Sequence, residues 1–333
     1  MASLKQLSTN INGEAGRQAL LSLLETSALL RMFESTGGWE LDATDFQYWT
    51  IGGNANLRTL AEGGTYDTIS TLAIDGKQNN SLKFYYDGFK VNQSRKFDAA
   101  KSLRDIDLWL QKKRKAIHRA FAKGVEKAIF VDDGTSNTMK GFAKNLDGTR
   151  LLGYESTDNF TDQEAKRVLD AAAFCKSSTA KKMDLTSDTD FDGFMELFYT
   201  SVSLMDNAKM MVIPDFAKPK ITTIARKAGL LGTTKNYEKV LETIGDIPLI
   251  TVPNNVITRL EADNTATPVN DTTSFYLLSP EEQRCSLVTN SGLWYNEYDH
   301  RENEQKDLEM FGINMQLKIE DNKSVLRVRN LKI

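Results

Sequence analysis

The sequence predicts an α+β fold, for three reasons. Apolar residues recur at three- and four-residue steps through 98–131, which is typical of one long helix. Within 66–86, two runs of β-favouring residues flank a polar, turn-forming cluster, which is typical of a long antiparallel hairpin. After residue 205, short strand-like runs alternate with helical segments and turns, so we expect a mixed sheet in the later half of the chain.

The composition excludes several classes of protein. The 333 residues, of which 40% are hydrophobic and 26% charged, suffice for one large domain or two ordinary ones and argue against wholesale disorder. A formal charge of -3 argues against nucleic-acid binding by bulk positive charge. Two cysteines are too few for a disulfide framework or a four-thiolate zinc site. Two histidines leave little material for histidine-based metal or triad chemistry. No apolar run reaches the ~20 residues of a membrane helix, so we expect a protein made in the cytoplasm with reduced thiols.

The beginning of the chain is expected to be a polar arm followed by a helix. Residues 1–17 are rich in Asn, Gly, Ser and Gln, which is typical of a mobile arm. Apolar residues at helical spacing predict a short amphipathic helix over 18–33, and Gly37 and Gly38 are expected to end it. We therefore assign residues 1–45 to an N-terminal arm with one short helix.

Residues 46–95 are expected to form an extended β-hairpin. The polar cluster 75–80, which includes Asp75, Gly76 and Lys77, is predicted to be its tip. The alternation of residues in the two runs gives at most one apolar face, and two strands alone are only marginally stable in water. Something else must therefore cover that face.

Residues 98–131 give the strongest local signal. No proline interrupts the apolar positions, and Asp98 can cap the start of the helix. Such a helix would be ~50 Å long, which is close to the ~52 Å diameter of a compact body of this chain length. One globular subunit cannot easily bury both this helix and the hairpin. A helix that is broken near Gly124 is the alternative.

The later part of the chain predicts a loop, further helices and a series of strands. We expect a glycine-containing loop over 132–153, helices over 161–176, 190–205 and 215–228, and strands over 209–213, 240–244, 247–252, 274–278, 285–289, 293–298, 313–319 and 325–328. Pro214 is expected to stop one strand, and Gly229 to close the last helix. The turn 320–324 predicts that the last two strands form a second hairpin.

Two short motifs resemble functional signatures but lack a required residue. Residues 132–135 resemble the signature of haloacid-dehalogenase-type phosphatases, yet Val131 stands where the nucleophilic Asp must be, and valine cannot form the aspartyl-phosphate. Residues 188–193 resemble the start of a calcium-binding loop, whose twelfth position must be a bidentate Glu and is here Tyr199. We therefore expect no catalytic residue, no cofactor and no metal site.

A basic run, Lys112-Lys113-Arg114-Lys115, lies within the predicted long helix. One helical turn points four successive side chains around most of the cylinder, so the run does not form a pure stripe. Two interpretations stay open. The run belongs to a solvated or partner-facing surface, or it contacts nucleic acid or an acidic partner.

The order of parts resembles the major capsid proteins of tailed bacteriophages, which have the Hong Kong 97-type fold. The local stretches that carry this resemblance lie at 60–64, 125–142, 207–213 and 244–250. In the first, Glu62 and Gly63 resemble the Glu-Gly segment of the family's extended loop. In the second, Gly134 and Gly141 resemble glycines that follow the helix end, and Asp132 stands where the family often has a glycine.

The resemblance covers roughly residues 45–333 and implies a domain organisation. The implied parts are an arm with a short helix (1–45), an extended loop (46–95), a peripheral domain with a spine helix (96–203), an axial domain with a mixed sheet (204–291), and return strands with a C-terminal hairpin (292–333). Adjacent copies of the subunit would cover the long helix and the hairpin. The expected assembly contacts are Glu62, Gly63, Asp75, Gly76, Lys77, Gly134 and Gly141.

The implied function is that of a coat protein without enzyme activity. It would self-assemble into hexamers and pentamers of an icosahedral phage head that encloses double-stranded DNA without sequence specificity. Expected partners are a separate scaffolding protein, a portal and decoration proteins, with assembly in the host bacterial cytoplasm, location in the virion and no membrane. Lys77 is the natural candidate for the Lys-Asn isopeptide bond of some relatives. The alternative is an encapsulin-like shell, and the distant alternative is a dehalogenase-like hydrolase.

Overall fold

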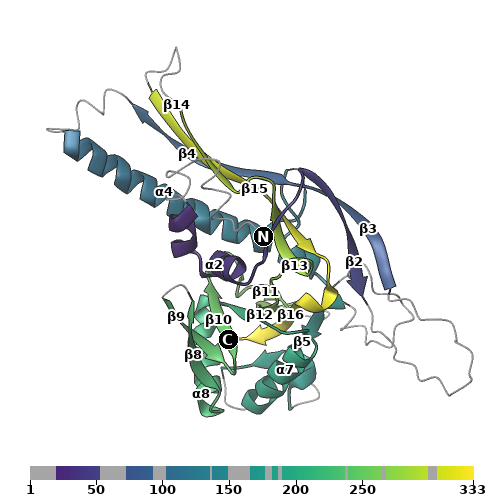
Figure 1. Cartoon of the computed structure of the whole chain (residues 1–333). Coiled ribbons are helices and arrows are strands. Elements are labelled where there is room, and N and C mark those ends of the chain that lie inside the picture. The colour runs from purple at the N-terminus through teal and green to yellow at the C-terminus, as the bar shows by residue number, and fades with distance from the viewer. Residues whose placement is uncertain are drawn as a thin grey trace, which may run out of the picture. The chain divides into compact units, whose positions relative to one another are not determined.

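The structure is a computed structural model of the chain. It describes residues 20–52, 73–92, 103–135, 137–148, 166–176, 182–186, 190–236, 239–263, 268–298 and 306–333. The chain divides into two compact units, each built from separate segments of the sequence (Figure 1). Unit 1 comprises Met1–Asp45, Ser81–Lys144 and Ser286–Leu317, and unit 2 comprises Phe46–Asn80, Asn145–Cys285 and Lys318–Ile333. Both units combine helices and strands, so the predicted α+β class is confirmed.

The helical start of unit 1 differs from the single helix that was predicted. Residues 20–26 are helical, and a second helix, α2 (Ala28–Ser35), follows after a break at Ser27. Ser27 has extended backbone, and its hydroxyl accepts a hydrogen bond of 3.2 Å from the N–H of Leu30. Serine in this position begins a helix, which explains the break. Gly37, with φ of 76°, follows the end of α2 as expected.

A five-stranded sheet belongs mainly to unit 1. Its strands are β1 (Trp39–Leu41), β13 (Cys285–Thr289), β15 (Lys306–Ile319), β14 (Leu293–Tyr298) and β4 (Lys83–Asn92). Strand β15 pairs antiparallel with both β14 and β4, and β1 joins β13 in parallel. The three strands predicted over 285–319 are thereby confirmed, and β15 provides the long central strand on which the others align.

The long predicted helix is present in unit 1 as α4 (Leu103–Val131), which has 29 residues. At 1.5 Å per residue it is about 43 Å long. It continues through Gly124, so the alternative of a broken helix is wrong. Its buried side packs against the sheet, where His118 and Phe121 meet Phe311 edge-on at ring-centroid distances of 4.8 and 5.0 Å.

Unit 2 is built on a nine-stranded mixed sheet. The strand order is β5 (Val168–Asp170), β16 (Val325–Lys332), β12 (Asn270–Leu278), β7 (Met210–Pro214), β10 (Ile247–Val252), β9 (Lys239–Ile244) and β8 (Leu231–Asn236), with β11 (Glu261–Ala262) on β12 and β6 (Met183–Asp184) on β16. Strand β10 is parallel to β7, whereas β12 is antiparallel to both β7 and β16. The mixed sheet predicted for the later half is therefore confirmed.

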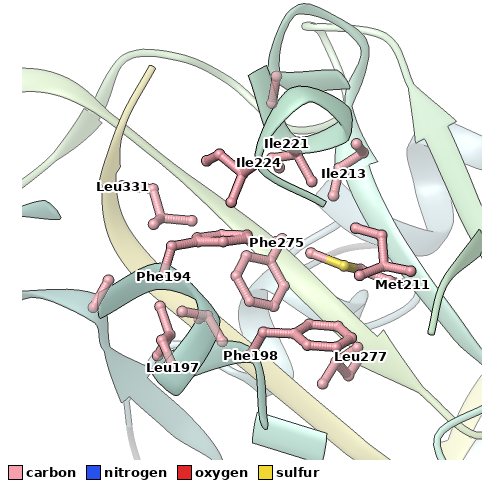
Figure 2. Packing of buried hydrophobic residues seen from close by; sticks show 14 of the residues in the cluster. Phe194, Leu197, Phe198, Met211, Ile213, Ile221, Ile224, Phe275, Leu277 and Leu331 are labelled. Carbon is pink, nitrogen blue, oxygen red and sulfur yellow. The ribbon is translucent and has the colours of Figure 1, made fainter. Parts of the chain in front are cut away.

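The core of unit 2 lies between this sheet and two helices. These are α7 (Phe191–Ser203), which Asp190 precedes, and α8 (Lys218–Lys227), which follows the short helix η3 (Asp215–Ala217). The buried side chains labelled in Figure 2 are Phe194, Leu197, Phe198, Met211, Ile213, Ile221, Ile224, Phe275, Leu277 and Leu331. They come from both helices and from three adjacent strands, so the helices cover one face of the sheet.

The polar cluster predicted to be a hairpin tip lies inside a strand instead. Asp75, Gly76 and Lys77 belong to β3 (Ala73–Ser81), which pairs with β2 (Asp45–Gly52) in a separate two-stranded sheet. The predicted turn is therefore wrong. Polar and glycine residues in a strand give no alternating apolar pattern, so local reasoning favours a turn at such a cluster. The connection between β2 and β3 lies outside the described residues, as do Glu62 and Gly63.

Two further predictions are corrected by long-range pairing. In the described part of the helix predicted over 161–176, Arg167 has φ of 54°, and β5 and the short helix η1 (Ala171–Phe174) follow. A left-handed residue ends a helix, and β5 instead pairs with β16. The predicted C-terminal hairpin is also wrong, because β15 and β16 belong to different sheets and are joined by η4 (Asn322–Ser324).

The compact units do not follow the predicted domain boundaries. Helix α7, which was assigned to 96–203, and strand β16, which was assigned to 292–333, both lie in unit 2. They do so because the unit 2 sheet collects strands from separate stretches of the chain. The peripheral and axial assignments stay predictions.

Candidate assembly surfaces

The two predicted contact glycines that follow α4 have roles within the chain. A Cβ on Gly141 would come within 2.8 Å of the carbonyl oxygen of Ile129 and 2.9 Å of backbone atoms of Phe130, so only glycine fits there. Gly134 has φ of 80° and follows Asp133, whose carboxylate accepts a hydrogen bond of 2.9 Å from the N–H of Thr135. Their contact with adjacent copies stays a prediction.

Tyr85 of β4 fixes the end of α4 to the loop that follows it. Its hydroxyl donates a hydrogen bond of 2.7 Å to the carboxylate of Asp132 and accepts one of 2.9 Å from the N–H of Met139. Burial, together with the nearby Asp132 carboxylate, raises the pKa of Tyr85 above its usual range, so the phenol keeps its proton. The dehalogenase-like stretch is thus a structural turn in which Asp132 accepts from a tyrosine.

A buried carboxylate holds α4 on the five-stranded sheet. The side chain of Glu309 on β15 is 4% exposed and accepts two hydrogen bonds of 2.6 Å from the guanidinium of Arg114. Tyr295 of β14 donates a further hydrogen bond of 3.0 Å. A bidentate Arg–carboxylate pair fixes orientation as well as distance, so this contact sets which face of α4 is turned to the sheet.

Five basic side chains occupy the exposed face of α4. We call them the basic row: Lys112, Lys115, Arg119, Lys123 and Lys127. Their steps of three and four residues place them on one side of the helix over about 22 Å. The sole acidic residue between positions 112 and 127 is Glu126, which is buried. The row contains three like-charge pairs at four-residue spacing, each of which destabilises a helix by ~0.2–0.5 kcal/mol.

Sequence reasoning found part of this surface, because Lys112 and Lys115 of the basic run belong to the row. Within the basic run, Arg114 turns to Glu309, and the amine of Lys113 lies 4.9 Å from the ring centre of Trp109 and 5.3 Å from that of Phe89. The row continues instead through residues 119–127, which lie outside the run. The four-residue spacing of these cations is the signal that would have found them.

Aromatic side chains form a second exposed surface, on β4 and β14. Phe84 stacks on Tyr86 and on Trp294, with ring centroids 5.2 Å apart in both pairs. Phe84 is 45% and Tyr86 60% exposed. Gly312 leaves room for the indole, because a Cβ there would lie 2.9 Å from the Trp294 ring and 2.6 Å from the carbonyl oxygen of Tyr85. We call these three rings the aromatic patch, and exposed rings of this kind are typical of an interaction surface.

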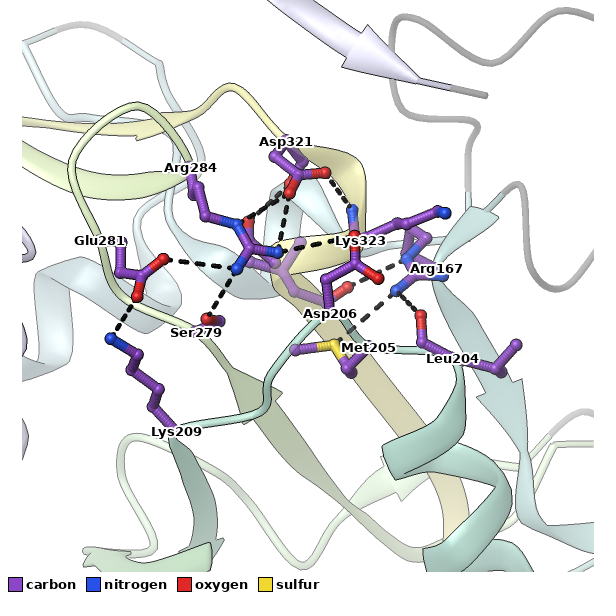
Figure 3. Close-up of polar contacts among 12 residues, drawn as sticks. Arg167, Leu204, Met205, Asp206, Lys209, Ser279, Glu281, Arg284, Asp321 and Lys323 are labelled. Carbon is purple, nitrogen blue, oxygen red and sulfur yellow. Dashed lines mark hydrogen bonds and ion pairs between the residues drawn. The ribbon is translucent and has the colours of Figure 1, made fainter. Parts of the chain in front are cut away.

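A cluster of ion pairs joins three segments of unit 2 (Figure 3). The guanidinium of Arg284 donates to the carboxylate of Asp321 at 2.9 Å and lies 3.4 Å from that of Glu281. Glu281 in turn accepts from the amine of Lys209, which is the main reason that the pKa of Glu281 is lowered. Charged groups that pair with one another in this way hold together the connections next to β7, β12 and β16.

The calcium-loop-like stretch is described from Asp190 onward. Asp190 of the calcium-loop-like stretch precedes α7 and accepts a hydrogen bond of 3.2 Å from the N–H of Asp184. In the part of the chain that the structure describes, no three His, Cys, Asp or Glu side chains group as ligands for a metal ion. Cys175 and Cys285 are free thiols. No helix within the described ranges has the length and apolar character needed to cross a membrane.

No protein-family model matches the sequence, and no curated protein matches it. Solved structures do match. The cyanophage A-1(L) capsid matches with a TM-score of 0.59 at 10% identity, over 92% of this chain and 93% of that one. The capsid of a native GTA particle matches with a TM-score of 0.55 at 12% identity, over 90% of each chain. The SrpI encapsulin of Synechococcus elongatus PCC 7942 matches with a TM-score of 0.54 at 10% identity, over 91% of this chain and 88% of that one.

The chain has the Hong Kong 97-type capsid fold. The resemblance inferred from the order of sequence elements is confirmed at this level. Since the identities are only 10–12%, the likeness is one of fold and transfers no individual residue role. The basic row and the aromatic patch are therefore features of this Hong Kong 97-type chain that are argued from its own side chains.

A buried glutamate in this fold gives a pH-dependent prediction. Glu126 of α4 is 6% exposed, and burial raises its pKa to about 7. The hydrogen bond with Ser27 and the positive charge of Lys123 lower this pKa, but their effect is smaller than that of burial. The folded state therefore holds a proton that the unfolded state releases near pH 4.5. We expect the free energy of unfolding to fall by roughly 2–3 kcal/mol as pH rises from about 4.5 to above 7.

The measurement is urea unfolding of the unassembled subunit at several pH values. Glu126→Gln is the matched control, because the amide keeps the shape and cannot ionise. Its unfolding free energy should lack this decline and exceed that of the wild type at pH 8. A wild type and a variant with parallel pH profiles contradict the assignment.

Proposed function

We propose that this chain is the major capsid protein of a phage head. In this proposal it self-assembles into hexamers and pentamers of an icosahedral shell that encloses double-stranded DNA, and its role is structural rather than enzymatic. The observation that carries the proposal is the extent of the fold likeness, which covers nine tenths or more of both this chain and two phage-type capsid subunits. A scaffolding protein, a portal and decoration proteins are the proposed partners, and the virion is the proposed location.

Two features of the chain bear on a role in a shell. Strands β2 and β3 form a two-stranded sheet that joins neither larger sheet within the described residues, and two strands alone are marginal in water. The aromatic patch leaves stacked rings exposed on a second sheet. Phe46 of β2 is already buried at 4% exposure, so it is the aromatic patch that needs a covering surface, and copies of the same subunit in a closed lattice would supply one.

An encapsulin-like compartment is the second candidate. The observation that favours it is the match to the SrpI encapsulin, whose TM-score of 0.54 is close to that of the GTA capsid, 0.55. The two candidates differ in what the shell contains. Nuclease-protected DNA inside purified particles supports the phage head, whereas enclosed protein without DNA supports the encapsulin-like shell.

The test of both candidates is negative-stain microscopy of the full chain, expressed alone and together with its neighbouring gene products. We expect closed shells in at least one of these conditions. Replacing Tyr86 in the aromatic patch with serine should leave a folded subunit and at least tenfold fewer shells, by the size of typical interface losses. Tyr199→Ser is the matched control, since Tyr199 is 56% exposed and lies outside the patch. A wild-type chain that stays monomeric in every condition contradicts a shell function.

A further inference from the structure

We infer that the basic row of α4 is the surface through which the subunit contacts the phosphate backbone of enclosed duplex nucleic acid. The inference rests on the proposed function, because it assigns one face of the subunit to the inside of a shell that holds nucleic acid. Its basis is the placement of Lys112, Lys115, Arg119, Lys123 and Lys127 on one exposed helix face.

The charge of the basic row is unusual for this protein. The whole chain carries a formal charge of -3, yet these five cations stand together without an exposed acidic neighbour between positions 112 and 127. The row covers about 22 Å, and duplex DNA presents one negative charge per ~1.7 Å of its axis. A uniformly charged rod can therefore meet every member of the row at once.

The neighbours of the row favour nucleic acid over a protein partner. Among the side chains of α4 that the structure describes, the exposed large apolar ones are Leu108, Trp109 and Val131. They flank the two ends of the row, and none lies between its cations. Ala116 and Ala120 alternate with the cations on the same exposed side. Protein interfaces are depleted in lysine and anchored by apolar or aromatic groups, whereas nucleic-acid interfaces are polar and positively charged.

The repulsion within the row gives a second argument. Lys115, Arg119, Lys123 and Lys127 form three successive like-charge pairs, which disfavour the isolated helix. The contacts of α4 with the sheet come from the opposite side of the helix, through residues such as Arg114. Within the row, Lys123 also lies near the buried carboxyl of Glu126. A bound polyanion would neutralise the row, so the repulsion between its cations would be replaced by attraction between each cation and the polyanion.

The experiment measures binding of the unassembled full chain to a duplex DNA of about 30 base pairs, longer than the row, over a series of salt concentrations. The row variant combines Lys112→Gln, Lys115→Gln and Arg119→Gln, and it leaves Lys123 beside Glu126 unchanged. We expect its affinity at about 0.1 M salt to fall by about two orders of magnitude, and the slope of log K against log salt to decrease by about 2.7. The urea midpoint should not decrease, because the change removes like-charge pairs.

Two controls make the outcome specific. Lys176→Gln, Arg226→Gln and Lys235→Gln together change the net charge by the same amount at exposed positions of unit 2, and should leave duplex binding unchanged. Lys115→Arg with Lys123→Arg keeps the charge of the row and should retain the affinity. These results would support a phosphate-contacting face.

Two results would overturn the inference. One is a row variant that binds duplex DNA with the wild-type affinity and salt slope. The other is a row variant that binds DNA normally but no longer forms shells, which would assign the row to contact with a second copy of the chain. Because duplex binding is measured on unassembled subunits, a failure of shell formation in the wild type is a separate result that contradicts the proposed function alone.

Discussion

Replacing Phe275 with alanine should destabilise unit 2 by about 3–5 kcal/mol. Phe275 is fully buried at the centre of β12, and its ring meets that of Phe194 at a centroid distance of 6.2 Å (Figure 2). Truncation removes this contact and leaves a cavity between α7 and the sheet, which cannot collapse because β12 is hydrogen-bonded to strands on both sides. Urea unfolding of the unassembled subunit measures the change.

Tyr199→Ala is the control for this variant. Tyr199 is also an aromatic residue of unit 2, but it is 56% exposed on α7, and its truncation should cost less than about 1 kcal/mol. Because shells form from folded subunits, we also expect the Phe275 variant to yield fewer particles at 37 °C. A loss below about 1 kcal/mol for Phe275→Ala contradicts the packing described for unit 2.

Replacing Arg114 with methionine should destabilise unit 1 by about 3 kcal/mol. The variant leaves the Glu309 carboxylate, which is 4% exposed, without its bidentate partner, while the hydroxyl of Tyr295 still donates to it. Breaking a buried ion pair costs more than the pair contributes, because the remaining charge is desolvated. We take the lower end of the usual range because the side chain of Arg114 is 34% exposed.

The double variant Arg114→Met with Glu309→Gln separates this effect from a loss of packing. Removing both charges should recover more than half of the stability lost in Arg114→Met, as measured by urea unfolding in parallel. A double variant as unstable as the single one would show that packing of the arginine stem, rather than the uncompensated carboxylate, is responsible.

The sequence was most informative where one element carries its own pattern. The apolar positions of α4 follow the helical period, and Gly245 between β9 and β10 marks a turn whose two strands are adjacent in sequence. Pro214 likewise ends β7 as predicted. In each case the residues that decide the structure lie within a few positions of one another, so local reasoning is sufficient.

Apart from the helix break at Ser27, which has a local cause, the wrong predictions depend on pairing with another strand. Residues 75–80 read as a turn because they are polar, but β2 pairs with them. Val168 starts a strand because β16 pairs with it from about 160 residues away, and β16 pairs with β12 rather than with its neighbour in sequence, β15. The same limit applies to the candidate surface. The exposure of the cations at 119–127 depends on which side of α4 packs on the sheet. Glu309 of β15 fixes that side by binding Arg114, and β15 follows α4 by more than a hundred residues, so local sequence reasoning could not find this contact.

The position of β16 also constrains when the subunit is ready to associate. This strand follows every other strand of the unit 2 sheet in the sequence, yet it lies inside the sheet, between β12 and β5. During translation, β12 therefore keeps an open edge until residues 325–332 have left the ribosome. A nascent chain that lacks residues 325–332 cannot complete this sheet, so a coat built from such subunits would incorporate only chains in which β16 has been made.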